Sequence, residues 1–267
     1  MTDALLENID NLPPIAESVQ ELERVYNNSE STLDDITNVL QKDPVLTADI
    51  LHLVNSPAYC LKNKINDIKH AVTLLGKDTI RTFALGSIIK SSFEIDLSPY
   101  GMSKDEFFNA CSKQLALSVN WLRVIESENL SVLAPASFLV DLGRIIISKT
   151  LIEDQKSDII ETALLAGENI SDAEIVACGV QTTDVTATLF EKWNFDLELI
   201  NIIKYANDPY EAQTPQEQRL AAELKVIRES VMPNGDITED SIATAKCTLE
   251  EFNLDLSSYE KAIEKIM

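Results

Sequence analysis

Glycine is scarce in this chain, with 7 among 267 residues. Average usage of about 7% would give roughly 19. The chain also lacks strand-like alternation of useful length, internal repeats and low-complexity tracts. So few turn formers argue against a many-stranded sheet, and abundant leucine, isoleucine, alanine and glutamate favour helices. With 45% apolar residues the chain can bury a sizeable core, and we predict an all-α fold.

Positive charge is also in short supply. The chain has 22 lysines and arginines against 44 acids, a formal net charge of −22. Such a surface repels phosphate backbones and anionic lipid, so it argues against nucleic acid as a partner. The charge serves solubility in one interpretation and steers the chain toward a basic partner in the other. The sequence localises no patch for such a partner.

Cysteines are few and far apart: Cys60, Cys111, Cys178 and Cys247. None forms a CxxC pair, which excludes a zinc-finger pattern and a disulfide framework. We interpret most of them as small hydrophobic core residues.

Targeting and membrane signals are missing as well. The N-terminus carries acids where a signal peptide would need bases. The longest apolar stretch, near 132–147, is interrupted by Asp141 and Arg144, so we expect no membrane insertion. These features predict a cytoplasmic protein.

Catalytic groups are sparse. No GxGxxG, Walker A or GxSxG motif is present. The two histidines, His52 and His70, are interpreted as surface or partly buried residues and not as ligands. Acid pairs such as Asp34 and Asp35 suit the first turn of a helix, where they complement its dipole. Composition and motifs therefore argue against an enzyme.

Helix start signals precede apolar residues at helical spacing along most of the chain. They are Thr32 to Asp35, Asp43-Pro44, Asp78, Ser103 to Glu106, Pro135, Ser171 to Glu174, and Thr214 to Glu217. Residues 93–102 lose this periodicity and contain Pro99 and Gly101, so they are the best candidate boundary between two helical lobes.

Residues 136–147 resemble the metal-binding helix of HD phosphohydrolases, with Val140 in the place of the histidine and Asp141 as the aspartate. In those enzymes imidazole and carboxylate ligands hold a divalent ion that acidifies a bound water. Valine offers no lone pair to a metal ion. The scaffold is therefore expected to have lost its chemistry.

Three motifs resemble the HD-related output domain (HDOD) family of bacterial signalling proteins. Leu12-Pro-Pro-Ile15 is similar to the LPPLP start of that family, and 43–59 is similar to its DPALTARLLRLANSAFY signature. Residues 65–76 resemble the VTSIRQAIALLG element that follows. The resemblance covers about 12–209.

The second half departs from the family at each ligand position except Asp141. Thr182 stands where a later histidine is common, and Ala206-Asn207 stands where an HH dipeptide is often seen. The upstream ligand falls within 109–112, which has no histidine. The degenerate site is therefore expected at Val140, Asp141, Thr182, Ala206 and Asn207, without metal or cofactor.

The resemblance implies an N-terminal helical bundle (about 12–97) packed on a degenerate HD-phosphohydrolase-like lobe (about 103–209). Residues 210–267 would form a C-terminal helical extension. The resemblance also implies signal transduction through protein contacts. Under a structural interpretation, Asp141 is a buried carboxylate bonded to local backbone or capped by Arg144.

Three functions stay open at this point. The leading one is a non-catalytic signalling module that binds a regulatory protein. The second is a divergent metal-dependent phosphohydrolase or cyclic-dinucleotide phosphodiesterase that uses carboxylates in place of histidines. The third is a sensor that binds a nucleotide in the vestigial cleft without cleaving it.

A polar break between apolar helices, Asn55-Ser56-Pro57, has two interpretations. It either shapes a groove between the lobes or serves only to stop a helix.

Overall fold

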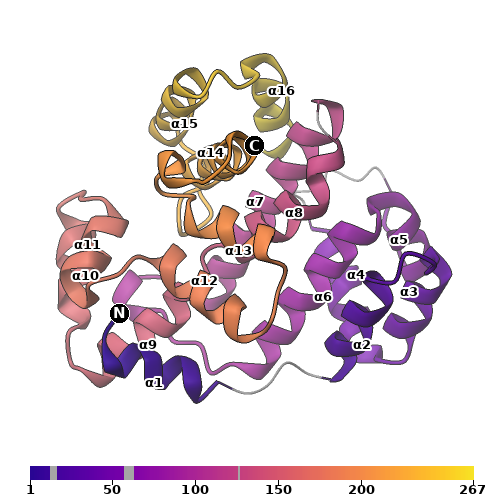
Figure 1. Cartoon of the computed structure of the whole chain (residues 1–267), viewed down its shortest axis with the longest axis horizontal. Helices are drawn as coiled ribbons and strands as arrows, with labels where there is room; N and C mark the ends of the chain where they lie inside the picture. The colour runs from indigo at the N-terminus through magenta and orange to yellow at the C-terminus, as the bar shows by residue number, and fades with distance from the viewer. Residues whose placement is uncertain (13–16, 57–62, 126) are drawn as a thin grey trace.

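A computed structural model describes residues 1–12, 17–56, 63–125 and 127–267 (Figure 1). Every regular element in these ranges is a helix, so the predicted all-α fold is confirmed. The first helices are α1 (Asp3–Asp10), α2 (Glu17–Tyr26), α3 (Leu33–Gln41), α4 (Pro44–Val54), α5 (Ile68–Leu75) and α6 (Lys77–Ser92).

The middle of the chain carries the elements that resemble an HD lobe. They are η2 (Ser98–Tyr100), α7 (Lys104–Ile125), η3 (Ser127–Asn129), α8 (Leu130–Leu139), α9 (Gly143–Glu153), α10 (Ser157–Leu165), α11 (Ile170–Cys178), α12 (Thr182–Lys192) and α13 (Leu197–Lys204). The C-terminal elements are η4 (Pro209–Glu211), α14 (Pro215–Ser230), α15 (Glu239–Glu251) and α16 (Leu256–Ile266).

Several helices begin at the predicted signals. Thr32 and Thr214 each form a capping box, in which the threonine side chain accepts from a backbone N–H and an acid returns the bond. Asp43 caps α4, and Pro44 occupies its first position. These bonds satisfy backbone donors that a helix N-terminus leaves without partners.

Two predicted start signals are wrong. Helix α6 begins at Lys77 after Gly76, and the carboxylate of Asp78 accepts a hydrogen bond from the Tyr26 hydroxyl on α2. Pro135 lies inside α8, which begins five residues earlier at Leu130. At Asp78, the contact with Tyr26 of another helix uses the carboxylate that was expected to cap α6.

The start of α11 is a third correction, and it bears on the site. Asn169 caps this helix by accepting from the backbone N–H of Ser171 at 2.8 Å. Glu174 does not return to the cap, because its side chain is fully buried on the inner side of the helix.

Helices α2 to α6 form one lobe, at the right of Figure 1. Their apolar sides meet in a core that includes Ile36, Leu40, Ile50, Val72 and Ile80. Helix α1 lies apart from this lobe and packs against α9. There Asn8 donates to Thr150 at 3.0 Å, and Ile9 O accepts from Lys192 at 2.8 Å.

The two lobes meet where α6 crosses α8. The rings of Phe83 and Phe138 contact edge to face, with centroids 6.3 Å apart. Gly86 permits this approach, because a Cβ atom there would lie 2.2 Å from the Phe138 ring. A side chain at Gly86 would therefore push the lobes apart.

The C-terminal helices pack on α7, α8 and α13 rather than hanging free (Figure 1). The ring of Trp121 on α7 meets Tyr259 on α16 at 5.7 Å, and its indole N–H donates to Ser258 at 3.1 Å. Lys113 on α7 also donates to the carbonyl of Gly235 at 2.6 Å. This extension therefore shares a core with the HD-like lobe.

One stretch, Leu130–Glu153, is long and apolar enough by composition to cross a membrane. Composition therefore does not by itself argue against a span, contrary to the sequence-based expectation. In the fold, 83% of its apolar window is buried inside the protein, as in a core helix of a soluble protein.

Candidate functional site around Asp141

The Val140-Asp141 pair lies in a turn between α8 and α9, not within one continuous helix as expected. Gly143 follows this turn, and its N–H donates to the Thr186 hydroxyl at 2.8 Å. A Cβ atom on Gly143 would lie 2.3 Å from Thr182 O, so only glycine lets α9 approach α12 this closely. The turn places the Asp141 side chain in the interior, where it is 3% exposed.

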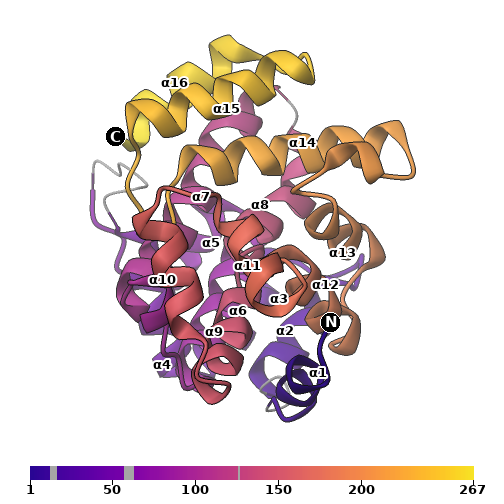
Figure 2. The same ribbon diagram turned by 90° about the vertical axis from the view of Figure 1, so that its left-hand side faces the viewer.

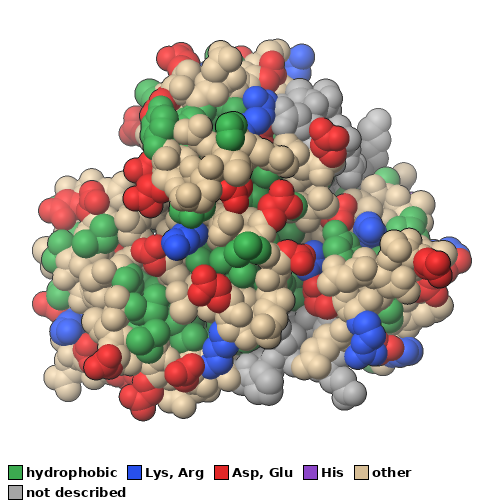
Figure 3. All heavy atoms as spheres, in the orientation of Figure 1, with side chains coloured by type: hydrophobic (Ala, Val, Ile, Leu, Met, Phe, Trp, Pro, Cys, Tyr) green, Lys and Arg blue, Asp and Glu red, His purple; other side chains and the backbone are tan. Residues whose placement is uncertain are grey.

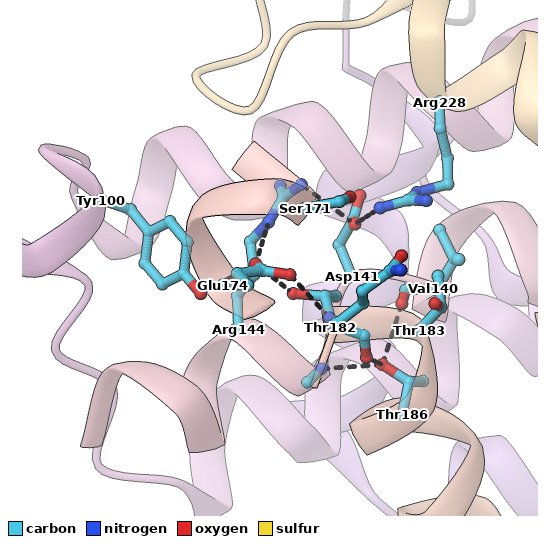
Figure 4. Close-up of polar contacts among 12 residues, drawn as sticks. Tyr100, Val140, Asp141, Arg144, Ser171, Glu174, Thr182, Thr183, Thr186 and Arg228 are labelled. Carbon is cyan, nitrogen blue, oxygen red and sulfur yellow. Dashed lines mark hydrogen bonds and ion pairs between the residues drawn. The ribbon is translucent and has the colours of Figure 1, made fainter. Parts of the chain in front are cut away.

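Three side chains from three helices hold the Asp141 carboxylate, and Figure 4 shows two of them, Arg144 and Arg228. Gln114 on α7 donates to Oδ2 at 3.0 Å. Arg228 on α14 donates to Oδ1 at 2.8 Å, and Arg144 Nη2 on α9 lies 3.3 Å from the same oxygen. Both carboxylate oxygens therefore have partners within the protein.

The charge state of Asp141 follows from these contacts. Burial is the largest single effect and would raise the pKa of its carboxyl, whereas the positive charges of Arg144 and Arg228 lower it. Hydrogen bonds from Gln114 and Arg228 lower it further, and these effects together outweigh burial. The pKa of Asp141 is held well below its usual range, and the residue is a carboxylate at neutral pH.

A second buried carboxylate, Glu174, lies behind Arg144 (Figure 4). It accepts from Thr182 N at 2.6 Å, from Thr182 Oγ1 at 2.5 Å and from the Tyr100 hydroxyl at 2.9 Å. Arg144 Nε lies 3.8 Å from Glu174 Oε1. Two arginines and two carboxylates thus form one neutral buried cluster, which we call the arginine centre: Asp141, Arg144, Glu174 and Arg228.

The predicted site residues gather around the arginine centre. Val140 is fully buried, and its carbonyl accepts from Thr186 at 2.8 Å. Thr182 bonds Glu174 as described above, and Asn207 Oδ1 accepts from Arg228 Nη1 at 2.5 Å. Ala206 is buried next to Asn207 and offers only a methyl group.

The upstream range 109–112 contributes less than expected. Cys111 is buried, and burial followed by the negative charge of Asp141 raises the pKa of its thiol. Ser112 donates to Phe108 O in its own helix at 2.8 Å, and Asn109 is exposed on α7. The residue that reaches Asp141 from this helix is Gln114, two positions past the range.

The interpretation of Asp141 as capped by Arg144 covers only part of its environment. Gln114, Glu174 and Arg228 were not identified from the sequence. Gln114 and Glu174 are polar positions on otherwise apolar helix faces, which is a usable signal. Arg228 lies outside the family motifs, so no local pattern connects it to Asp141.

The expected groove at Asn55-Ser56-Pro57 can be described for its first two residues, because Pro57 lies outside the described residues. Asn55 donates to Leu51 O and Ile65 O, both at 2.7 Å, and accepts from Ile65 N at 2.8 Å. A cavity of about 980 Å³ contacts Asn55, Ser56 and Asn109. Asn55 therefore fixes the chain after α4, at the edge of a cavity that reaches α7.

A cleft of about 440 Å³ opens beside the arginine centre. Its basic lining residues are Arg144, Lys225 and Arg228, and its acidic ones include Asp141 and Glu229. The cleft lies between the start of α11 and the C-terminal helix α14, so both the HD-like lobe and the extension form its walls.

The metal that an HD fold implies does not fit these residues. Among the residues that the structure describes, no three His, Cys, Asp or Glu side chains are placed together to hold a metal ion. His52 and His70 are exposed on the N-terminal lobe. Asp141, which stands at the position of the metal-binding aspartate of HD phosphohydrolases, already bonds two guanidinium groups and an amide.

Solved structures share this architecture over nearly the whole chain. A virulence factor from Campylobacter jejuni is 27% identical, with a TM-score of 0.61 over 100% of this chain and 98% of its own. An HDOD domain protein from Geobacter sulfurreducens is 20% identical, with a TM-score of 0.63 over 98% of this chain and 95% of its own. The fold is that of HD-phosphohydrolase-like helical proteins.

The HDOD domain family matches residues 12–209. The chain therefore belongs to the HDOD family of signalling proteins, as the motifs predict. An uncharacterised protein of Treponema pallidum is 21% identical over 211 residues, which span 76% of this chain and 39% of that protein. The chain thus spans well under half the length of this curated relative.

Proposed function

We propose that this chain is a non-catalytic regulatory module of bacterial signal transduction that acts through protein–protein contacts in the cytoplasm. The observation that carries this proposal is the arginine centre. The acid that would bind metal in an HD hydrolase is instead bonded by Gln114 and Arg228, with Arg144 beside it.

The charges of the arginine centre favour a structural role for Asp141. Arg144 and Arg228 supply the two positive charges that a divalent ion would bring. Removing one partner from a buried ion pair leaves an uncompensated charge and costs about 3–5 kcal/mol. A metal ion would have to displace the guanidinium groups against a cost of this kind.

The donor chemistry favours the same role. Val140 and Ala206 have no lone pairs on their side chains. Thr182 donates to Glu174, and Asn207 accepts from Arg228. Imidazole and carboxylate are the usual ligands for the ions of HD-type hydrolases. The residues at these positions are therefore engaged in packing and in hydrogen bonds within the protein.

Metal analysis and a hydrolysis assay test the proposal together. Purified protein, incubated with manganese, iron or zinc and then desalted, is expected to retain no stoichiometric ion and to hydrolyse no phosphomonoester or cyclic dinucleotide. An Asp141→Ala variant provides the matched baseline for both measurements. A bound ion with turnover, both lost in Asp141→Ala, would favour a divergent phosphohydrolase and refute the proposal.

The cleft favours a second candidate, a nucleotide sensor without hydrolysis. Arg144, Lys225 and Arg228 line a space of about 440 Å³ together with Asp141, Asp172, Asp208 and Glu229, and Lys225 is the basic lining residue that lies outside the arginine centre. A volume of this size lies within the usual range for small-ligand sites.

Thermal-shift measurements with nucleotides test this candidate. A ligand present at a hundred times its dissociation constant stabilises a protein by about 2.7 kcal/mol. The shift is expected to shrink in Lys225→Gln and to persist in Lys261→Gln, whose lysine lies exposed on α16 and does not line the cleft. If no nucleotide shifts the melting temperature, the sensor candidate fails.

A further inference from the structure

Helices α10 and α11 carry large apolar side chains on their outer faces. Leu165 is 84% exposed, Val176 is 77% exposed and Ile175 is 44% exposed. Their inner faces are buried, through Ile160 and Ala163 on α10 and through residues 173, 174, 177 and 178 on α11. Both helices are therefore packed on the protein along one side and leave an apolar side uncovered.

The stretch of chain that contains α10 and α11 has acidic residues but no basic ones. No lysine or arginine occurs between Lys156 and Lys192, although the segment contains seven acids. Four of them lie on α10, α11 and the loop between these helices, with exposed side chains: Asp158, Glu161, Glu168 and Asp172. Within this segment the uncovered apolar side chains therefore have acidic but no basic neighbours along the chain.

The two helices pack on each other at one edge of the molecule, in front of the rest in Figure 2. In Figure 3 the space-filling surface at the left edge, over these helices, shows hydrophobic and acidic side chains together. We call the exposed apolar and acidic side chains of these helices and of the loop between them the α10–α11 face: Asp158, Glu161, Leu165, Glu168, Asp172, Ile175 and Val176.

Helix α11 links this face to the arginine centre. Its inner side carries Glu174, which bonds Thr182 and Tyr100 and faces Arg144. The next residue, Ile175, lies on the outer side. A partner on the α10–α11 face would therefore contact the same two turns of helix that hold the buried cluster.

We propose that the α10–α11 face docks a basic amphipathic helix of a protein partner. This inference rests on the proposed function, because it assigns the protein contact to a surface. Apolar residues at i, i+3 or i+4 of the partner would cover Leu165, Ile175 and Val176. Its lysines and arginines would meet the surrounding acids, which steer association and select against acidic partners.

Charge complementarity separates this partner from other occupants. A second copy of the chain would bring the same acids against Asp158, Glu161, Glu168 and Asp172, with no basic residue from the segment to offset them. Anionic lipid and nucleic acid would be repelled in the same way. A basic helical segment satisfies both the apolar and the acidic side chains.

A synthetic peptide serves as the probe. It has about 18 residues, or five helical turns, with leucine on one face and lysine on the other. Its affinity for the full chain is measured by fluorescence anisotropy at about 0.15 M salt. A matched peptide with glutamate in place of lysine is expected not to bind.

Paired variants test the location of binding. Leu165→Ser with Val176→Ser is expected to weaken binding about tenfold or more, because burial of one such side chain is worth about tenfold in affinity. Glu161→Gln with Glu168→Gln should weaken it about threefold. The matched controls, Val45→Ser with Leu197→Ser and Glu250→Gln with Glu264→Gln, alter comparably exposed residues elsewhere and should leave affinity unchanged.

Hydrogen exchange of the full chain locates the peptide independently and is expected to show protection within residues 157–179. Equal weakening by the control pairs, or protection confined to other helices, would refute the proposal. So would self-association in sedimentation that Leu165→Ser with Val176→Ser abolishes, because a second copy would then be the occupant.

The outcomes separate this inference from the proposed function. Suppose that the α10–α11 face variants and the control variants bind the peptide equally, and that the protein retains no metal and hydrolyses no substrate. The assignment of this surface then fails, and the proposal of a non-catalytic module is unaffected. If a metal and turnover are found, the proposed function fails whatever the peptide does.

Discussion

The arginine centre and the α10–α11 face both collect charge, but they balance it differently. In the centre, two arginines neutralise two carboxylates, and all four side chains are buried or nearly so. On the face, four exposed acids have no basic residue within the segment. Internal charge that is already matched serves stability, whereas external charge that is unmatched is available to another molecule.

The largest expected effect comes from removing the acid at the middle of the centre. Asp141→Ala leaves Arg144 and Arg228 buried without their shared carboxylate and is expected to lower the free energy of unfolding by about 3–5 kcal/mol. Urea denaturation measures this loss. Asp172→Ala, an exposed acid in the first turn of α11, is the control and should cost under about 1 kcal/mol. Equal losses would contradict the contrast between the two regions.

The acid dependence of stability gives the next effect. Because the folded state lowers the pKa of Asp141, its charge contributes stability above the unfolded pKa of about 3.9. That contribution is lost as the pH falls from there through the lower folded pKa. The difference in unfolding free energy between the wild type and Asp141→Asn should therefore be constant above about pH 5 and shrink in more acid solution. A difference in unfolding free energy that grew on acidification would contradict a lowered pKa of Asp141 in the folded state.

Arg228 is expected to matter less than Asp141, because Arg144 and Gln114 remain when it is removed. Arg228→Met should lower the free energy of unfolding by about 2 kcal/mol. Lys225→Met, one turn earlier on α14, should change it by under about 0.5 kcal/mol. A double-mutant cycle with Asp141→Ala measures the coupling. Additive losses would mean that the contact between α14 and Asp141 contributes nothing.

The smallest stability effect is expected on the α10–α11 face. Leu165→Ser and Val176→Ser remove exposed side chains, so each should change the free energy of unfolding by under about 0.5 kcal/mol. Chemical denaturation of both variants checks this. A loss of several kcal/mol would show that these side chains support the fold instead of remaining free for a partner.

Local patterns predicted much of the fold. Caps at Thr32, Asp43 and Thr214 were identified because each uses bonds within four residues of the chain. The caps expected from Asp78 and Ser171 failed where a distant group competed. Asp78 turns to Tyr26, and Glu174 is drawn inward by Thr182, Tyr100 and Arg144.

The candidate site was predicted in location but not in chemistry. The family motifs placed Val140, Asp141, Thr182 and Asn207, and these four do lie around one buried cluster. They could not supply Arg228, which is 87 residues from Asp141 in sequence. Long-range ion pairs leave no periodic signal in a single sequence, because either partner alone looks like an ordinary charged residue.

The packing of α14 and α16 shows that the end of the family match and the end of the folded core do not coincide in this molecule. The match to the family model ends at residue 209, but the packed core continues beyond it. A chain ending there would lose the guanidinium from Arg228 and uncover the indole of Trp121, which Ser258 and Tyr259 now shield. The last 58 residues therefore complete the interior of the module, and trimming them would yield a damaged protein and not a minimal one.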